Sequence, residues 1–230
     1  MDTQIIWQLM IVAIISYLIG SINLSIIISK AMGKGDIRDQ GSGNAGTTNT
    51  LRVLGKGPAL LVFLWDVLKG ALAVWLARLI AGFAPEAQLN VVYVYGIFLA
   101  SVGAILGHNF PIYFGFKGGK GVATSIGVVL AIEWQIGLVC LVTGLLMVAL
   151  FNMVSIGSII SAILYPVLVV IMGSHFDDKF SAFKLAYNIF AIILSASIII
   201  RHKANIIRIR EGRENPLIKP KNQEETKENN

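Results

Sequence analysis

The segment IIWQLMIVAIISYLIGSINLSIIIS, from Ile5 to Ser29, decides the class of fold. It contains no charged residue, and it is longer than the ~20 residues that a helix needs to cross a hydrocarbon layer about 30 Å thick. It is also too long for the apolar part of a signal peptide, and Asp2 precedes it instead of a basic stretch. We therefore expect a first transmembrane helix and no cleaved signal peptide.

Similar apolar runs recur along the chain, in which 55% of the residues are hydrophobic and 14% are charged. This composition excludes a soluble protein. We predict an all-α, polytopic integral membrane protein with about seven transmembrane helices. The predicted spans are 4–29, 57–81, 89–107, 120–132, 134–152, 155–173 and 184–201. The fourth is short, so one broken segment over 120–152 would leave five or six spans.

Lysine and arginine are distributed unevenly between the connecting segments. Five lie within 30–56, two lie in the central loop 117–120, and eight follow from residue 201 onward. The segment 82–88 has none, and 174–184 balances two lysines with two aspartates. Because basic residues accumulate in cytoplasmic loops, we expect the N-terminus outside and the C-terminus in the cytoplasm. These loops explain the formal net charge of +6 without nucleic acid as a partner.

The polar, glycine-rich and basic segments then all lie on the cytoplasmic side, where they can form one shared site. We expect residues 1–214 to be a single membrane domain, and the Lys-, Glu- and Asn-rich segment 215–230 to be a disordered cytoplasmic tail. No internal repeat is apparent in the sequence, which disfavours the inverted-repeat transporter folds.

The first candidate motif is GSGNAGTTN, from Gly41 to Asn49, followed by Arg52. Its glycines match the dinucleotide pattern G-x-G-x-x-G, but no strand precedes them and Asp66 lies inside an apolar span. We interpret the motif as a loop that presents N–H groups and hydroxyls to an anion, with the arginine as a phosphate clamp. A flexible polar connector is the alternative. The candidate residues are Ser42, Gly43, Asn44, Asn49 and Arg52.

The second candidate motif combines GHNFP, from Gly107 to Pro111, with FKGGKGVAT, from Phe116 to Thr124. Glycines allow several N–H groups to point at one anion, and lysine supplies the countercharge. We therefore predict a phosphate cradle at the membrane surface. It is not an ATP-binding P-loop, because phenylalanine replaces the first glycine and glycine follows the last lysine. The candidate residues are His108, Asn109, Gly118, Gly119, Lys120, Gly121 and Thr124.

The third candidate motif begins with RHKANIIR at residue 201 and ends at Glu214. His202 and Asn205 are three residues apart and share a helix face at the cytoplasmic end of the last span. His202 is the best candidate for a general base. We assign the arginines of this stretch, Arg201 among them, to membrane topology and lipid headgroups.

Polar residues inside the spans provide two further candidates. Asp66 and Lys69 are three residues apart and can pair, either as functional groups or as a structural ion pair. Ser155 and Ser158 share a face near the start of the sixth span, where their hydroxyls suit either a phosphate or helix packing.

No pattern in the sequence indicates a metal site. The three histidines are dispersed, paired catalytic carboxylates are absent, and the one cysteine, Cys140, lies in an apolar run. No histidine is followed five residues later by aspartate, which excludes the His-x-x-x-x-Asp mechanism of acyltransferases that use acyl-CoA. Composition and spacing alone leave two close alternatives, a membrane enzyme acting on a phosphorylated substrate and a membrane transporter of an organic phosphate.

Over about residues 10–214, the chain resembles the bacterial membrane glycerol-3-phosphate acyltransferases that use acyl phosphate, the PlsY family. The resemblance rests on the three motifs in order and on Asp66–Gly70. It implies a seven-helix membrane fold with the N-terminus outside. It also implies the first acylation of phospholipid synthesis, in which acyl phosphate and sn-glycerol 3-phosphate give lysophosphatidic acid, acylated at the 1-position, and inorganic phosphate.

The resemblance implies roles for individual residues as well. Catalytic positions are matched by Ser42, Arg52, Lys120 and His202, and we assign structural support to Asp66, Lys69 and Glu214. The other candidates, Asn205 and the serine pair included, are assigned to binding of the substrates and their phosphates. No cofactor or metal is implied. The implied partners are glycerol 3-phosphate, long-chain acyl phosphate and membrane lipid, for a monomer in the bacterial cytoplasmic (inner) membrane whose site faces the cytoplasm.

Overall fold

The computed structural model describes residues 3–172 and 182–217, and every regular element within these ranges is a helix. Within these two ranges, six helical segments are long and apolar enough to cross a membrane, which confirms the predicted all-α membrane fold. The predicted fourth span, which the sequence already indicates to be short, corresponds to an apolar helix of only 11 residues, so the count of seven full spans is not confirmed. The six long segments are Thr3–Ala31, Lys56–Ala81, Glu86–Phe114, Trp134–Phe151, Val154–Met172 and Lys184–Arg201. The predicted tail beyond residue 217 and most of the predicted loop 174–184 lie outside the described residues.

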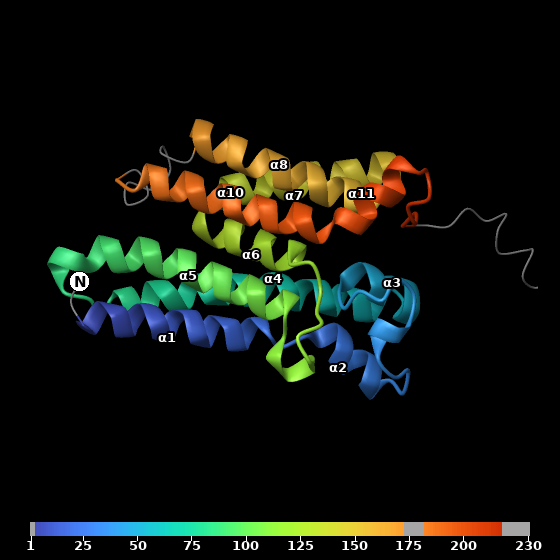
Figure 1. Cartoon of the computed structure of the whole chain (residues 1–230), viewed down its shortest axis with the longest axis horizontal. Coiled ribbons are helices and arrows are strands. Elements are labelled where there is room, and N and C mark those ends of the chain that lie inside the picture. Colours follow the sequence, from blue (N-terminus) through green and yellow to red (C-terminus); the bar gives the residue numbers. More distant parts are fainter. Residues whose placement is uncertain (1–2, 173–181, 218–230) are drawn as a thin grey trace, which may run out of the picture.

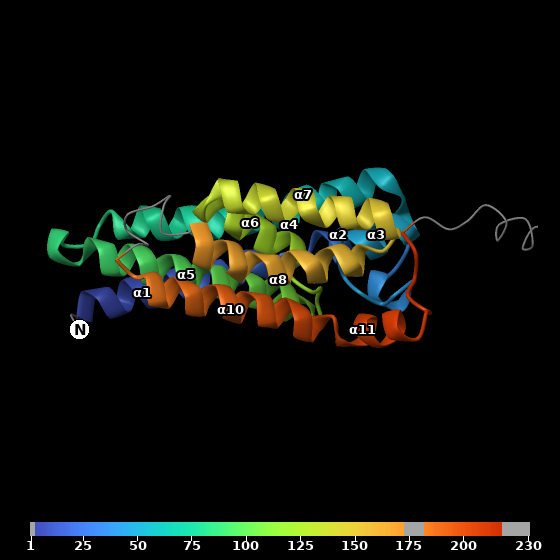
Figure 2. The ribbon, with the colours of Figure 1, turned by 90° about the horizontal axis from the view of Figure 1, so that it is seen from above.

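The long helices lie side by side along one axis (Figures 1 and 2). Their bounds, with those of the short helices, are α1 Thr3–Gly20, α2 Leu24–Ala31, η1 Ile37–Asp39, α3 Thr47–Leu54, α4 Lys56–Ala81, η2 Glu86–Gln88, α5 Leu89–Asn109, η3 Ile112–Phe114, α6 Val122–Ile132, α7 Trp134–Phe151, α8 Val154–Met172, α10 Lys184–Arg201 and α11 Lys203–Arg210. In Figure 1, α6 lies between one group formed by α1, α4 and α5 and another formed by α7, α8 and α10. The short helices α2, α3 and α11 gather at the end of the bundle opposite the N-terminus.

Two breaks interrupt the apolar segments. The first separates α1 from α2, so the single helix predicted over 4–29 is wrong in this detail. Asn23 stabilises the break, because its side-chain oxygen accepts the Ile26 N–H and its side-chain amide donates to the Ala45 carbonyl oxygen. The second break, at Glu133, separates α6 from α7 as predicted. The first break therefore ties the first span to the loop of the first candidate motif.

Helix α6 begins at Val122, within the second candidate motif, and crosses α4 at very short range. A Cβ atom on Gly127 would lie 1.9 Å from the Val67 carbonyl oxygen, and one on Gly70 would lie 2.1 Å from the Thr124 carbonyl oxygen. No side chain fits at either contact, and small residues commonly allow such close approach between transmembrane helices. The crossing fixes the start of α6, and with it Lys120, relative to α4.

Candidate active site

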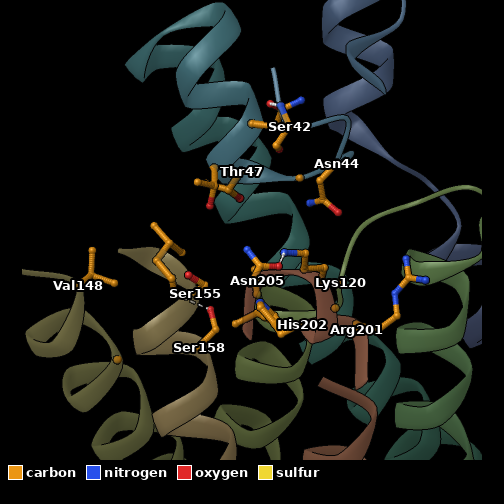
Figure 3. A pocket seen from close by; sticks show the side chains of 18 of the residues that line it. Ser42, Asn44, Thr47, Lys120, Val148, Ser155, Ser158, Arg201, His202 and Asn205 are labelled. Atoms are coloured by element: carbon orange, nitrogen blue, oxygen red, sulfur yellow. Dashed lines mark hydrogen bonds between the residues drawn. The ribbon is translucent and has the colours of Figure 1, made fainter. Parts of the chain in front are cut away.

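One cavity of about 660 Å³ lies among α3, α4, α6, α7, α8 and α11. Residues of all three candidate motifs line it, which agrees with the prediction of one shared site (Figure 3). The predicted site residues that line the cavity are Ser42, Gly43, Asn44, Asn49, Arg52, Asp66, His108, Gly118, Lys120, Gly121, Ser155, Ser158, His202, Asn205 and Glu214.

Lys120 is the central cation of the polar end of the cavity. Its Nζ donates to the side-chain oxygen of Asn205, so the second and third motifs are in direct contact (Figure 3). The pKa of Lys120 is lowered to about 8, mainly by burial and also by three neighbouring arginines, while the carboxylate of Glu214 opposes the shift. The site therefore holds a positive charge that a bound anion would stabilise.

Glu214 connects α8 with α11 beside Lys120. Its Oε1 accepts hydrogen bonds from Asn205 Nδ2 at 2.7 Å and from Ser155 Oγ at 3.0 Å. Its Oε2 accepts one from Arg208 Nε at 2.8 Å. Burial would raise the pKa of Glu214, but these hydrogen bonds keep it below its ordinary value. An ionised carboxylate with this many donors orients the residues around it rather than reacting itself.

His202 lies at the junction of α10 and α11 and is only 3% exposed. Its Nδ1 is 2.8 Å from the carbonyl oxygen of Ile198. Because a carbonyl can only accept, Nδ1 carries the proton and Nε2 keeps its lone pair. Burial, and then the charge of Lys120, lower the pKa of His202 to about 4. The imidazole is therefore neutral at pH 7 in the unliganded site.

The first motif forms a loop that Asn49 holds from inside. The Asn49 Oδ1 accepts the Ser42 N–H at 2.8 Å, and its Nδ2 donates to the carbonyl oxygens of Ile37 and Gln40. Asn49 is almost fully buried, at 1% exposure. Its polar groups are thus used within the protein, and we assign it to the architecture of the loop instead of to phosphate binding.

The segment after α11 closes one side of the cavity. Arg52 Nη2 donates to the carbonyl oxygens of Asn215 at 3.3 Å and Pro216 at 3.4 Å. The Leu217 N–H donates to the Asn152 carbonyl oxygen at 2.7 Å. Residues 215–217 therefore form a strap across the cavity, from α3 to the α7–α8 turn. The sequence places these three residues in the predicted disordered tail, 215–230.

Two glycine amides of the second motif are used within the protein and are therefore not available for the predicted phosphate cradle. The N–H of Gly118 donates to the Asn109 carbonyl oxygen, and that of Gly119 donates to the His108 carbonyl oxygen, each at 3.1 Å. A Cβ on Gly119 would lie 2.1 Å from His108 Nε2, so this glycine is required by packing. Asn109, Gly119 and Thr124 are buried and lie outside the cavity lining formed by the described residues.

The predicted pair of Asp66 and Lys69 is confirmed and forms part of a larger buried cluster. Asp66 Oδ1 is 2.7 Å from Lys69 Nζ and 3.3 Å from His108 Nδ1. Lys69 also donates to the Ile22 carbonyl oxygen at the break between α1 and α2. All three side chains are at least 96% buried. His108 thus lies in the wall behind Lys120, in contact with a carboxylate.

Polar residues that the sequence did not single out also line the cavity, among them Thr47, Thr48, Arg201 and Arg208. Thr47 is the first residue of α3, in the threonine-rich end of the first motif. Arg201 and Arg208 were assigned to topology. The position of Arg201 depends on a contact with Gly119, 82 residues away in the sequence, which spacing does not reveal. Arg208 contacts Glu214, six residues further along the same motif.

The cavity also has an apolar arm along α7, lined by Leu141, Leu145 and Val148. Leu145 is 59% exposed and lies on a helix long and apolar enough to span a membrane. The arm therefore reaches from the cationic end of the cavity to the lipid-facing surface. A ligand that joins a phosphate to an alkyl chain matches this arrangement.

Comparison with known proteins agrees with this geometry. The family model described as glycerol-3-phosphate acyltransferase matches residues 10–212. Proteins of that name from Shouchella clausii and Clostridioides difficile are 43% and 40% identical, over 91% and 92% of this chain and 96% and 97% of their own lengths. The fold is similar to that of the integral membrane glycerol 3-phosphate acyltransferase PlsY in its glycerol 3-phosphate form. That chain has a TM-score of 0.76 and 34% identity, over 90% of this chain and 94% of its own.

The lysophosphatidic acid form of PlsY is also similar, with a TM-score of 0.71 and 33% identity. The family match extends from the first span to Gly212 in the third motif, so it includes the segments that contribute to the cavity except Glu214 and the strap. Family membership also decides between the two alternatives left by composition and spacing, in favour of acyl transfer over transport. The chain thus belongs to the glycerol-3-phosphate acyltransferase family of integral membrane enzymes of lipid synthesis.

Proposed function

We propose that the protein transfers the acyl group of a long-chain acyl phosphate to the 1-hydroxyl of sn-glycerol 3-phosphate. The observation that carries this proposal is the joining, in one cavity, of a cationic end to an apolar arm. Both proposed substrates contain a phosphate, and the donor adds an alkyl chain. The cationic end contains Arg52, Lys120, Arg201 and Arg208, and the arm lies along α7.

Two groups of side chains suit the two phosphates. Lys120 and the hydroxyls of Ser155 and Ser158, at the start of α8, line the same cavity (Figure 3). We assign these three residues to the acyl phosphate, whose chain would follow the apolar arm. Arg52 and Asn205 are assigned to glycerol 3-phosphate, next to His202. Charge-assisted hydrogen bonds from arginine and lysine are the strongest clamps available for such groups.

The proposed chemistry is a direct transfer. The oxygen of the glycerol 1-hydroxyl attacks the acyl carbonyl carbon, the bond from that carbon to the phosphate oxygen breaks, and inorganic phosphate leaves with the electron pair. Phosphate is already a good leaving group, so no acyl-enzyme is needed. The protein positions the two substrates and stabilises charge on the leaving phosphate, which is the work that Lys120 and its neighbours suit.

The hydroxyl proton has two possible acceptors, His202 Nε2 and a phosphate oxygen of the substrate. The Nδ1 contact with Ile198 leaves Nε2 as the acceptor in the cavity, which supports the first. The low pKa of His202, about 4, makes it a weak base until a bound phosphate adds negative charge, which supports the second.

Replacing His202 with glutamine separates these acceptors. If His202 is the base, His202→Gln lowers kcat by about 10²-fold or more, because glutamine hydrogen-bonds but takes no proton. A kcat close to that of the wild type with a raised KM for glycerol 3-phosphate would assign the proton to the substrate phosphate. Steady-state rates at saturating donor distinguish the two results.

The basic segments support a placement of the site on the cytoplasmic side of the bacterial inner membrane. Lys30, Lys34 and Arg38 lie beside the first motif, and Lys203, Arg208, Arg210 and Arg213 follow the last span. This placement gives the site access to glycerol 3-phosphate from the cytoplasm and to the acyl chain from the inner leaflet. We propose a monomer, since the cavity is formed within one chain.

The decisive experiment uses purified full-length protein in lipid mesophase, with glycerol 3-phosphate and either palmitoyl phosphate or palmitoyl-CoA. Release of phosphate and formation of lysophosphatidic acid from palmitoyl phosphate alone is the expected result. Lys120→Met should abolish this activity, whereas Lys117→Met, which changes an exposed lysine of the same motif, should leave it near the wild-type rate. Activity only with palmitoyl-CoA would reject the proposed donor, and folded protein without product from either would reject the proposed reaction.

A further inference from the structure

The last membrane helix ends in Arg201, whose side chain turns inward to the α5–α6 loop. Its Nη2 donates to the main-chain carbonyl oxygen of Gly119 at 2.6 Å. Its guanidinium carbon also lies 5.1 Å from the centre of the Phe110 ring, within the range of a cation–π contact. Arg201 therefore holds the same loop at two points. A residue that only anchors the helix end in lipid headgroups needs neither contact.

The hydrogen bond joins the immediate neighbours of two site residues. Gly119 precedes Lys120, and Arg201 precedes His202. Consecutive Cα atoms are about 3.8 Å apart, so a bond between residues 119 and 201 fixes the separation of the backbones that carry Lys120 and His202. Asn205, one helical turn further along the chain, accepts a hydrogen bond from the Lys120 ammonium group.

The opposite side of the same loop is fixed to α5. The Gly118 and Gly119 N–H groups donate to the carbonyl oxygens of Asn109 and His108, and the His108 ring lies against Gly119 without room for a side chain. The peptide before Lys120 is thus held from α5 by its N–H groups and from α10 by its carbonyl oxygen. Figure 3 shows Lys120 between Asn205 and Arg201.

We propose that Arg201 is a positioning residue for the acyl transfer: through Gly119 and Phe110 it holds the loop that carries Lys120 against the end of α10 that carries His202. This inference rests on the proposed function and deepens it. The planar guanidinium donates to a carbonyl while lying over an aromatic ring, and a lysine ammonium has neither the shape nor the reach to replace both contacts. A lysine can still anchor the helix end in lipid headgroups. The variant Arg201→Lys therefore distinguishes positioning of the loop from anchoring of the helix.

The kinetic test uses full-length Arg201→Lys, with Lys203→Gln as the control. Lys203 is an exposed basic residue two positions further along the chain. Displacing a reacting group by about 1 Å costs up to about 10²-fold in rate, so we expect kcat to fall by about 10- to 100-fold in Arg201→Lys. The KM for glycerol 3-phosphate should change by less than about threefold, because its assigned ligands are untouched. A kcat within about twofold of the wild-type value would overturn the proposal.

A second readout does not depend on catalysis. Mass spectrometry would follow the rate at which an amine-reactive reagent labels Lys120 in the membrane-embedded protein. In the wild type, burial and the Asn205 contact restrict this labelling. Freeing the loop in Arg201→Lys should accelerate it at least about fivefold, while Lys203→Gln labels Lys120 at the wild-type rate.

The two readouts separate the inference from the proposed reaction. Unchanged Lys120 labelling in Arg201→Lys would overturn the positioning role, whether or not the protein acylates glycerol 3-phosphate. Faster labelling of Lys120, in a protein that does not transfer the acyl group, would uphold the structural link and reject the reaction. Phe110→Leu removes the ring alone and should give an intermediate effect on both readouts, which keeps the test open if Arg201→Lys unfolds.

Discussion

At the scale of single residues, the surroundings of Lys120 determine whether its side chain is charged. Burial and three arginines lower its pKa to about 8, although Glu214 opposes them. An ordinary lysine, with a pKa near about 10.4, stays charged at pH 9, whereas Lys120 of the unliganded protein is mostly neutral there. Only the charged form attracts a phosphate. Binding of acyl phosphate to the free protein should therefore weaken as the pH rises through about 8.

We predict that kcat/KM for acyl phosphate falls about tenfold per pH unit above the pKa of Lys120, because kcat/KM reports groups of the free enzyme. Arginine stays protonated throughout this range, so Lys120→Arg should lose this alkaline decline whatever its remaining activity. Initial rates of both proteins from about pH 6 to pH 10 test this, after subtraction of the rate at which the donor breaks down without enzyme. Lys117→Arg should keep the wild-type profile. A wild-type profile that stays level to pH 10 would contradict the assignment.

Contacts between residues close in sequence were more predictable than contacts between distant ones. The pairing of Asp66 with Lys69 follows from helical spacing and the cost of an isolated charge in a membrane. The use of the Gly118 and Gly119 amides could not be read from the sequence, because it depends on how the chain folds back onto α5. Glycine spacing indicates a tight loop but not which way its N–H groups point.

At the scale of helices, the crossing of α4 and α6 determines where the second motif lies. Gly127 contacts the Val67 main chain directly, and Gly70 contacts that of Thr124. Since α6 is only 11 residues long, it has little other contact length with which to compensate for a displacement. Its position should therefore be sensitive to a single added methyl group.

We predict that Gly127→Ala destabilises the protein by about 1–3 kcal/mol and lowers activity, because the added Cβ forces the two helices apart. Gly57→Ala is the matched control: it lies in the first turn of α4, and nothing lies within 4 Å of its added Cβ. Thermal unfolding in detergent, together with the acyl transfer rate, measures both effects. Equal stability of the two variants would show that the crossing is looser than the contact implies.

The number and boundaries of the helices could be predicted from the sequence only where hydropathy marks them. Apolar length correctly predicts the spans of α4, α5, α7, α8 and α10, with boundaries within a few residues. The break between α1 and α2 was missed, since serine and asparagine are tolerated within an apolar segment. Asn23 caps α2 by accepting the Ile26 N–H, and its second contact, to the Ala45 carbonyl oxygen, lies 22 residues further along the chain, where spacing does not reveal it.

At the scale of the whole molecule, the charge distribution predicted that three separate motifs meet at one side of the membrane, and the single cavity brings them together. The closing strap was not predictable, because residues 215–217 lie at the start of a polar, lysine- and glutamate-rich segment. Their order comes from partners on α3 and on the α7–α8 turn. Composition describes how a segment behaves alone, and not which surface it can bind.

If Arg52 binds glycerol 3-phosphate as proposed, the strap and the substrate phosphate compete for its guanidinium. Its two contacts with the strap are long, 3.3 and 3.4 Å, and neutral, so a phosphate should displace them. We predict that ending the chain after Glu214 lowers the KM for glycerol 3-phosphate by up to about fivefold, the value of one weak hydrogen bond. Ending it after Leu217 keeps the strap and is the control. A higher KM in the shorter chain alone would instead make the strap part of the binding site.

The apolar arm along α7 has a practical consequence for the handling of the protein. Leu145 both lines the cavity and faces the surrounding medium, so whatever amphiphile replaces the lipid has access to the same arm. We therefore expect an alkyl detergent with a phosphate-like or zwitterionic headgroup to compete with the proposed donor, more strongly as its tail lengthens. Inhibitor screens in such detergents would miss compounds that bind in the apolar arm, because the detergent occupies it. Screens in short-tailed nonionic detergents would detect these compounds.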